Sequence, residues 1–488
     1  MIFLSFRTLP RGFVPRAIIL AAVFALIYTY HTGLLTGDTK QKSRKTSIND
    51  DPRCAAYPDP GTIAVAVRAS ASDITPESLS RTFTTLRCLS PSRLLLFSDL
   101  DYSVGPYQLH NVLSEVTPSL VQTHPDFEFY RQQHSYTAEG GNVRDLHKKP
   151  VLRANGPHQD EHSSQSLEKY KYLHMIERAW KLAPGMEWYA FFDESSFISW
   201  PNLVRWLRGI DASKMRYMGH KTHLSDLELD VGAEKGGIIL SGALVESLAN
   251  AQNSVARAWD RRAADMDSGS QVLATALQTE LSINLTDSWP LTVGEEIGMV
   301  PFQQEMWCEP VIAIPALPVD TTAKLLANEQ AMLAINKDFI LSYGHVFKQM
   351  AMDHSMVIAD YWYNAADIAE DPNYAVDWND PRGRTDDHYF DPNDSFSACA
   401  LACNNYRDCV QFQYLSYAAV RRRDGSTKYE GGICHLSKVF RFGKARDTKY
   451  WADRDDDDER GGTLDNTHMY TSGWNIARFL DARAKAVC

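Results

Sequence analysis

The sequence predicts a mixed α/β protein with a mainly parallel sheet, preceded by one membrane-spanning helix and followed by a small disulfide-rich module. Three observations lead to this expectation. Apolar, strand-like runs alternate with amphipathic helical stretches, an uncharged apolar run lies near the N-terminus, and four of the eight cysteines fall in one short C-terminal stretch. Alternating strands and helices are typical of parallel sheets covered by helices. The 488 residues, 44% of them hydrophobic, are enough for two or three domains.

The N-terminal run is expected to be a signal anchor. Residues 17–37 carry no charge and follow three arginines, Arg7, Arg11 and Arg16. A spanning helix needs about 20 apolar residues, so this run is long enough. The rival is a cleaved signal peptide, but no small-residue cleavage site follows Tyr30. We therefore expect a cytoplasmic tail at 1–16, a transmembrane helix at 17–37 and a polar stem at 38–53.

Cysteines and glycosylation sequons indicate on which side of the membrane the chain folds. Basic residues flank the anchor on both sides, so charge alone does not fix its orientation. All eight cysteines follow the anchor, and their number is even, which is typical of an oxidising compartment. Asn284 and Asn393 each begin an N-glycosylation sequon. We expect a single-pass type II protein of the Golgi or endoplasmic reticulum membrane, with the C-terminal side in the lumen.

The first globular domain is expected to span residues 54–345. Its predicted elements are a buried strand at 62–67, a helix at 76–87, a strand at 94–97, a helix at 167–182 and a strand at 188–192. Pro201 is suited to the first turn of a further helix. Residues 140–166 are polar and are expected to form an exposed loop.

The C-terminal part is expected to contain a linker at 346–394, a Cys-rich module at 395–440 and an extension at 441–488. The spacing of Cys399, Cys403, Cys409 and Cys434 resembles that of PAN or apple-like modules. Zinc binding is the rival interpretation, but paired Cys-x-x-Cys motifs are absent from this stretch, so we expect disulfides. Four cysteines allow three connectivities, and the sequence does not choose among them.

The other four cysteines allow two further bridges. Cys54 is expected to pair with Cys88. Cys308 could pair with Cys488 or remain a buried free thiol.

Two acidic residues, Asp193 and Glu194, directly follow the apolar strand at 188–192. In open α/β sheets, ligands bind just beyond the carboxyl ends of the strands. Carboxylates in that position can hold a divalent cation that neutralises a diphosphate leaving group. The alternative is a solvated strand end with an acidic cap for the next helix.

The order and spacing of several segments resemble the fringe-like glycosyltransferases of family 31, in particular a fungal branch with a C-terminal Cys-rich module. The resemblance covers about residues 54–440 and is carried by the segments 86–88, 96–99, 170–173, 187–192, 200–207, 217–219, 236–241, 307–311 and 328–330. It implies a GT-A-type fold, a nucleotide-sugar donor that is usually a UDP-sugar, Mn²⁺, and a glycan or glycoprotein acceptor.

The resemblance also implies roles for individual residues. Asp193 stands at the first position of the family's metal-binding acidic motif, and Glu194 is a second metal candidate. Gly236 and Gly237 would let the backbone approach donor or acceptor closely. Trp307 falls in a segment assigned to the substrate site.

Three positions depart from the family's pattern. Ser195 stands where the last acidic residue of the metal motif is expected, and Ser270 where the catalytic base Asp is expected. The metal-binding His is absent from residues 313–317. Neighbouring acidic residues could substitute, and Asp265 and Asp267 lie closest in sequence to Ser270. Asp267 and Ser270 are therefore the candidates for the catalytic position.

These observations leave three hypotheses. The first is a membrane-anchored transferase that moves a hexose-type sugar from a nucleotide sugar to a glycan or glycoprotein, with Mn²⁺ near Asp193. The second is a catalytically inactive scaffold that binds glycans or proteins. The third is a metal-independent transfer in which Lys235 and Lys221 steady the diphosphate. Nucleic acid is not an expected partner, because the net charge is −11 and no basic stretch dominates.

Overall fold

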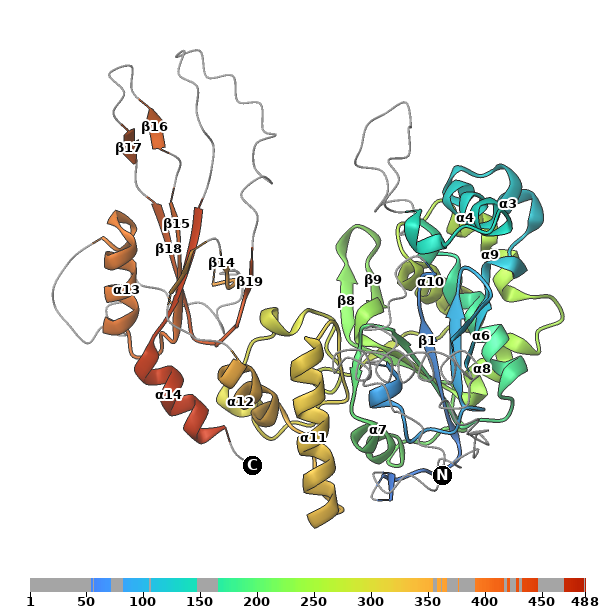
Figure 1. The fold of residues 1–488 in the computed structure, drawn as a ribbon, viewed down its shortest axis with the longest axis horizontal. Coiled ribbons are helices and arrows are strands. Elements are labelled where there is room, and N and C mark those ends of the chain that lie inside the picture. The colour runs from blue at the N-terminus through green and yellow to red at the C-terminus, as the bar shows by residue number, and fades with distance from the viewer. Residues whose placement is uncertain are drawn as a thin grey trace, which may run out of the picture. The chain divides into compact units, whose positions relative to one another are not determined.

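The fold comes from a computed structural model (Figure 1). It describes residues 54–55, 57–71, 82–104, 107–146, 166–353, 358–360, 362–366, 376, 391–416, 419–421, 427–429, 432–445, 469–486 and 488. The chain divides into two units, residues 1–55 and 56–488, and the fold below is that of the second. The expected tail, signal anchor and stem at 1–53 lie outside the described residues. Within the described residues, no helix is both long and apolar enough to span a membrane.

An eight-stranded sheet forms the centre of the fold. Its strand order is β11-β7-β10-β5-β1-β2-β4-β3. The strands are β1 (Ile63–Arg68), β2 (Leu94–Ser98), β3 (Tyr102–Val104), β4 (Tyr107–Asn111), β5 (Trp188–Asp193), β7 (Tyr217–Gly219), β10 (Ile238–Ser241) and β11 (Leu285–Asp287). The chain is therefore a mixed α/β protein, and the strands expected at 62–67, 94–97 and 188–192 are confirmed to within two residues.

The sheet combines a parallel block with antiparallel additions. Strands β4, β2, β1 and β5 are parallel neighbours, whereas β10 runs antiparallel to both β5 and β7. The parallel pairing places Arg68 directly beside Asp193, the last residues of β1 and β5. Carboxyl ends of parallel strands meet at one edge, so this edge is where the expected site residues can gather.

Apolar side chains on both faces explain why the central strands are buried. Ala64 and Ala66 of β1 face the cluster formed with helices α6 (Lys171–Leu182), α8 (Gly242–Ala249), α9 (Val255–Ala263) and α10 (Gly269–Leu281). The alternate residues Ile63, Val65 and Val67 face α7 (Trp200–Leu207) on the other side. This is the two-faced burial that gives central strands a continuous apolar run.

Two expected helices can be compared with the structure. The helix predicted at 167–182 corresponds to α6, Lys171–Leu182, and to a helical turn at residues 166–168 just before it. The first half of the helix predicted at 76–87 lies outside the described residues, and residues 82–85 are helical. Pro201 lies in the first turn of α7, as expected.

The second unit also contains helices and strands outside the central sheet. They are α3 (Pro118–Thr123), α4 (Glu128–Ala138), the short pair β6 (Phe197–Ile198) and β12 (Ala313–Ile314), the hairpin β8 (Lys221–Leu224) and β9 (Leu229–Gly232), α11 (Val319–Ile335) and α12 (Tyr343–Asp353).

A second sheet forms the Cys-rich module. Its order is β13 (Ile358–Asp360), β20 (Met469–Trp474), β15 (Gln411–Ser416) and β18 (Gly432–Ser437), with α13 (Phe396–Asn405) and α14 (Ile476–Lys485) beside it. Two small pairs, β14 (Trp362–Tyr363) with β19 (Lys444–Ala445) and β16 (Ala419–Arg421) with β17 (Thr427–Tyr429), accompany it. Strands β13 and β20 come from the segments expected to be the linker and the C-terminal extension, so the module draws on more of the chain than residues 395–440.

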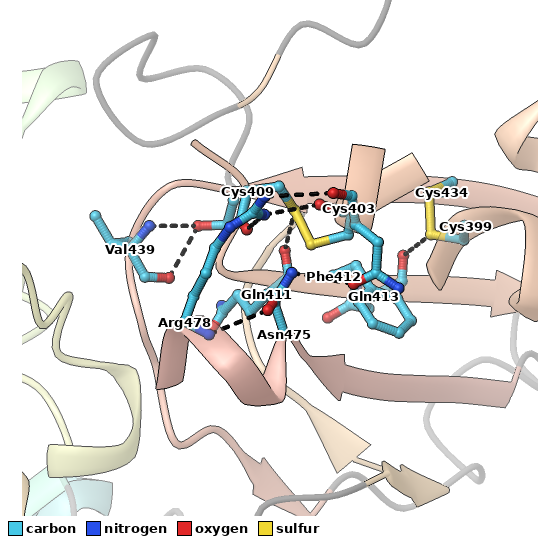
Figure 2. Close-up of a disulfide and its surroundings, with 12 residues drawn as sticks. Cys399, Cys403, Cys409, Gln411, Phe412, Gln413, Cys434, Val439, Asn475 and Arg478 are labelled. Atoms are coloured by element: carbon cyan, nitrogen blue, oxygen red, sulfur yellow. Dashed lines mark hydrogen bonds between the residues drawn. A yellow bond between two sulfur atoms is a disulfide. The ribbon is translucent and has the colours of Figure 1, made fainter. Parts of the chain in front are cut away.

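Two disulfides hold the module's helix. Cys399 in α13 is bonded to Cys434 in β18, and Cys403 is bonded to Cys409 just before β15. Figure 2 shows Arg478 of α14 reaching the end of α13, where its guanidinium donates to the carbonyl oxygens of Cys403 and Cys409. Because the last carbonyls of a helix lack partners within it, this arginine caps α13.

All eight cysteines are disulfide-bonded, including Cys54 and Cys88. The alternative of a free thiol at Cys308 was wrong, because Cys308 is bonded to Cys488. The physical reason is the path of the C-terminus. It passes so close to Gly344 that a Cβ there would lie 2.9 Å from the Ala486 carbonyl oxygen, and this brings Cys488 to Cys308.

An aromatic cluster joins the module to the rest of the second unit. Phe302 and Phe440 exchange two backbone hydrogen bonds of 2.8 and 3.0 Å. Trp307 packs on Phe347 with ring centroids 4.8 Å apart. Phe442 and several aliphatic side chains are buried in the same cluster. We call this group the aromatic junction.

Candidate functional site

A buried arginine lies at the carboxyl end of β1. The side chain of Arg68 is only 6% exposed, and it contacts carboxylates from three other segments. Its Nε lies 3.3 Å from Glu168 Oε2, its Nη1 lies 2.9 Å from Glu234 Oε2, and its Nη2 lies 3.4 Å from Asp193 Oδ2. We call Arg68 and these three carboxylates the Arg68 cluster.

A second cation and an aromatic ring support this cluster. The ammonium of Lys171 is fully buried, lies 2.5 Å from Glu168 Oε1 and donates to the Ala69 carbonyl oxygen. Burial disfavours the charged ammonium, but Glu168 and Asp99 raise the pKa of Lys171 above its ordinary value. The Tyr172 ring lies 4.9 Å from the guanidinium carbon of Arg68, within the range of a cation–π contact. The cluster of three carboxylates therefore contacts a guanidinium and, through Glu168, an ammonium.

Asp193 is held in one orientation by its neighbours. Its Oδ1 accepts hydrogen bonds from the Ser195 backbone N–H at 3.1 Å and from the Ser195 hydroxyl at 2.8 Å. Burial acts to raise the pKa of Asp193, but the charge of Arg68 and the Ser195 donors hold it below its ordinary value. Burial and the nearby Asp193 charge raise the pKa of Glu194 well above its ordinary value. The pKa values of these two adjacent acids are therefore shifted in opposite directions.

Glu234 places a carboxylate beside Ser270. Its Oε1 accepts a hydrogen bond of 2.9 Å from the backbone N–H of Ser270 in the first turn of α10. Burial acts to raise the pKa of Glu234, but Arg68 and the backbone donors at Ser270 and Gly269 lower it. A carboxylate at a helix N-terminus is further favoured by the helix dipole.

The two catalytic candidates, Ser270 and Asp267, differ in their surroundings. Ser270 is buried, and its hydroxyl lies 3.1 Å from that of Ser268, the N-cap of α10. Asp267 is exposed, and its backbone N–H donates to Gln271. The predicted substitute Asp265 is exposed as well. Of these positions, Ser270 is the one brought into contact with the Arg68 cluster.

The three predicted substrate-binding residues lie in tightly packed surroundings. A Cβ on Gly237, whose φ is +93°, would meet the Phe192 ring, and one on Gly236 would lie 2.7 Å from the Val293 carbonyl oxygen. Both glycines are thus required by close packing within the chain. Trp307 is 4% exposed and belongs to the aromatic junction. The contacts of its ring are packing contacts.

The two lysines of the metal-independent hypothesis are both exposed. Lys221 is exposed at the start of the β8–β9 hairpin and pairs with Asp230 at 3.7 Å. Lys235 is exposed, and its carbonyl oxygen accepts from the Ser196 hydroxyl.

The residues at this edge do not fit a divalent cation in their present arrangement. Mg²⁺ and Mn²⁺ need several oxygen ligands directed at one point. The Asp193, Glu168 and Glu234 carboxylates are instead directed at Arg68. In the part of the chain that the structure describes, no group of three or more His, Cys, Asp or Glu side chains is arranged to hold a metal. The expectation of Mn²⁺ near Asp193 and Glu194 therefore stays a prediction without a matching ligand set.

The two sequons differ in their surroundings. Asn284 and Thr286 are both exposed beside and within the edge strand β11. Asn393 is partly buried, and its Oδ1 accepts from the Cys434 backbone N–H at 2.9 Å. Asn284 is thus the more accessible acceptor.

Sequence reasoning missed Arg68, Glu168, Lys171 and Glu234. One signal was available: an arginine ends an otherwise apolar strand that is buried throughout. In comparisons with known proteins, no family model matches this chain, and no curated protein matches it.

Proposed function

We propose that the chain is a membrane-anchored glycosyltransferase with a GT-A-type domain, and that the Arg68 cluster is its sugar-binding and catalytic site. The donor is a nucleotide sugar, in the first instance a UDP-hexose, and the acceptor is a hydroxyl of a glycan or glycoprotein. The compartment is the lumen of the Golgi or endoplasmic reticulum.

One observation carries the proposal. The two positions that the resemblance assigns to the acidic motif and to the base, 193 and 270, are far apart in the sequence. Arg68 and Glu234 link them, since Arg68 contacts both Asp193 and Glu234, and Glu234 accepts from the Ser270 N–H. The replaced base is thus compensated by a carboxylate from a neighbouring segment.

The chemistry of the cluster suits sugar hydroxyls. The side chains of Glu168, Asp193 and Glu234 remain 23%, 19% and 22% exposed while Arg68 is buried beneath them. Ionised carboxylates are pure acceptors, so their free lone pairs can bind hydroxyl groups. In transfer, a carboxylate takes the proton of the acceptor hydroxyl, whose oxygen bonds to the anomeric carbon while the nucleoside diphosphate leaves. We assign the base role to Glu234.

The test is turnover of a panel of UDP-hexoses by the purified full chain in detergent, followed as UDP release with glycan acceptors. Removal of a general base lowers rates by about 10²–10⁴-fold, and we expect this for Glu234→Gln. Glu115→Gln is the matched control, because Glu115 also pairs with two cations, Arg178 and Lys181, but lies outside the cluster. Equal rates in both variants would refute the assignment of Glu234.

A second candidate function is a non-catalytic glycan-binding protein. It is favoured by the fact that the cluster's carboxylate oxygens already have partners, which lowers the pKa of Glu234 and weakens it as a base. Binding of glycans without any UDP release across the donor panel would support this alternative.

A further inference from the structure

The centre of the proposed site is a cation that belongs to the chain. Each of the three guanidinium nitrogens of Arg68 lies within 3.4 Å of a different carboxylate, and these carboxylates come from three different segments. Arg68 therefore stands between Glu168, Asp193 and Glu234, where a divalent ion shared by them would have to stand. The in-register pairing of Arg68 with Asp193 fixes this position through the backbone of the sheet.

The outer oxygens of the same carboxylates are also engaged. Lys171 contacts Glu168 Oε1, Ser195 donates twice to Asp193 Oδ1, and the Ser270 N–H donates to Glu234 Oε1. A metal entering here would displace these donors and approach a guanidinium whose positive charge repels it. Because arginine stays protonated at every physiological pH, this repulsion is permanent.

We propose that Arg68 is a built-in counter-ion that replaces a divalent cation at this edge of the sheet, so that the site binds its ligand without metal. The exclusion of metal from this site follows from the residues themselves. The further statement that the site binds a nucleotide sugar without metal rests on the function proposed above. The ligand class is an uncharged polyhydroxyl group such as a sugar ring, since the partly exposed carboxylates offer acceptors and the cluster has more anions than cations.

Titration of the full chain in detergent with Mn²⁺, followed by the electron paramagnetic resonance signal of the free ion, tests this proposal. We expect wild type and Asp193→Asn to leave equal amounts of Mn²⁺ free. Arg68→Met and Arg68→Gln leave three carboxylates facing one another, and each is expected to bind Mn²⁺ at least tenfold more tightly than wild type. Adding Asp193→Asn to either variant should abolish the gain.

Arg93→Met is the matched control. Arg93 is also buried, pairs with the single carboxylate of Asp59 and lies just before β2, at the opposite edge of the sheet. Its loss should reduce stability without creating Mn²⁺ binding. Circular dichroism establishes which variants fold.

Two outcomes would overturn the proposal. One is Mn²⁺ binding by wild type that Asp193→Asn abolishes; the other is a folded Arg68 variant that gains no Mn²⁺ affinity. If neither Arg68 variant folds, the comparison of wild type with Asp193→Asn decides alone. A separate titration with UDP-glucose and UDP-galactose in chelator or Mn²⁺ should give equal affinities. Failure to bind any nucleotide sugar would refute the proposed function and leave the Mn²⁺ result standing.

Discussion

The Arg68 cluster, built around a buried cation, and the buried aromatic junction are held together by opposite kinds of interaction. The cluster gathers ionised groups, each of which depends on its partners for a favourable environment. The junction gathers aromatic rings and lies beside a module stapled by two disulfides. A buried ion-pair group contributes little net stability compared with apolar packing, so its presence at a strand end points to function.

The largest expected effects on stability come from one substitution in each of the two regions. Arg68→Met should lower the free energy of unfolding by about 3–5 kcal/mol, because it removes the buried cation that the three partly exposed carboxylates share. Phe347→Ala should cost a similar amount, about 3–5 kcal/mol, through a cavity in the aromatic junction. Chemical denaturation at pH 7 measures both.

The stability losses of Arg68→Met and Phe347→Ala should depend differently on pH. Asp193 and Glu234 have lowered pKa values in the folded protein, so their stabilising contribution is present above the unfolded-state pKa and is lost as pH falls. The cost of Arg68→Met should therefore shrink as the pH falls through about 4, the range in which unfolded carboxyls titrate. The cost of Phe347→Ala should not. Parallel pH dependences would contradict the ionic account of the cluster.

The two module disulfides should contribute different amounts to the free energy of unfolding. The Cys399–Cys434 bridge spans 35 residues and the Cys403–Cys409 bridge spans 6. Loop-closure entropy predicts losses of about 4 and about 2 kcal/mol when each pair is replaced by alanines. Thermal unfolding of the two double variants checks the order, and a larger loss for the shorter loop would contradict it.

Glu329 is a buried carboxyl whose hydrogen-bond partners in the described part of the chain are hydroxyl groups. Its oxygens accept from the hydroxyls of Ser199 and Tyr57, and burial raises its pKa to about 7. Because the folded pKa is raised, its stabilising contribution is complete below the unfolded pKa of about 4.3 and is lost as pH rises through 7. Glu329→Gln should stabilise the protein by about 3 kcal/mol at pH 8 and by little at pH 4. A stabilisation by Glu329→Gln that does not vary with pH would refute the raised pKa of Glu329.

The smallest effects are expected at the sequons. Asn284→Gln should remove one N-glycan, seen as a loss of intact mass, with little change in stability because Asn284 is exposed. Asn393→Gln should cost about 1 kcal/mol, since the Asn393 side chain accepts from the Cys434 N–H. If the mass of Asn284→Gln differs from that of the wild-type protein only by the added methylene group, Asn284 is not modified.

The sequence predicted the parts of this molecule that local patterns determine. Continuous apolar runs gave the strands β1, β2 and β5, and the cysteine spacing gave a disulfide-bonded module. The direction of β10 was beyond reach, because an apolar run reads the same in both directions. Strands β13 and β20 were missed, because they pair with each other although more than one hundred residues of sequence separate them.

The candidate site was predicted only in part. Asp193 was found because it follows a strand, and the carboxyl ends of parallel strands are a known location for ligands. Glu234 was missed because it is 166 residues from Arg68, and nothing local marks the two as partners. The glycines and Trp307 were assigned to substrate, whereas the structure gives them packing contacts.

Amide hydrogen exchange of the full chain with a panel of nucleotide sugars tests the location of the site most directly. If the Arg68 cluster binds the sugar, one donor of the panel will slow exchange at residues 194–196, 234–237 and 269–271 and leave the module unchanged. Protection confined to the module, or no protection with any donor, would contradict the claim that this edge of the sheet is the functional site.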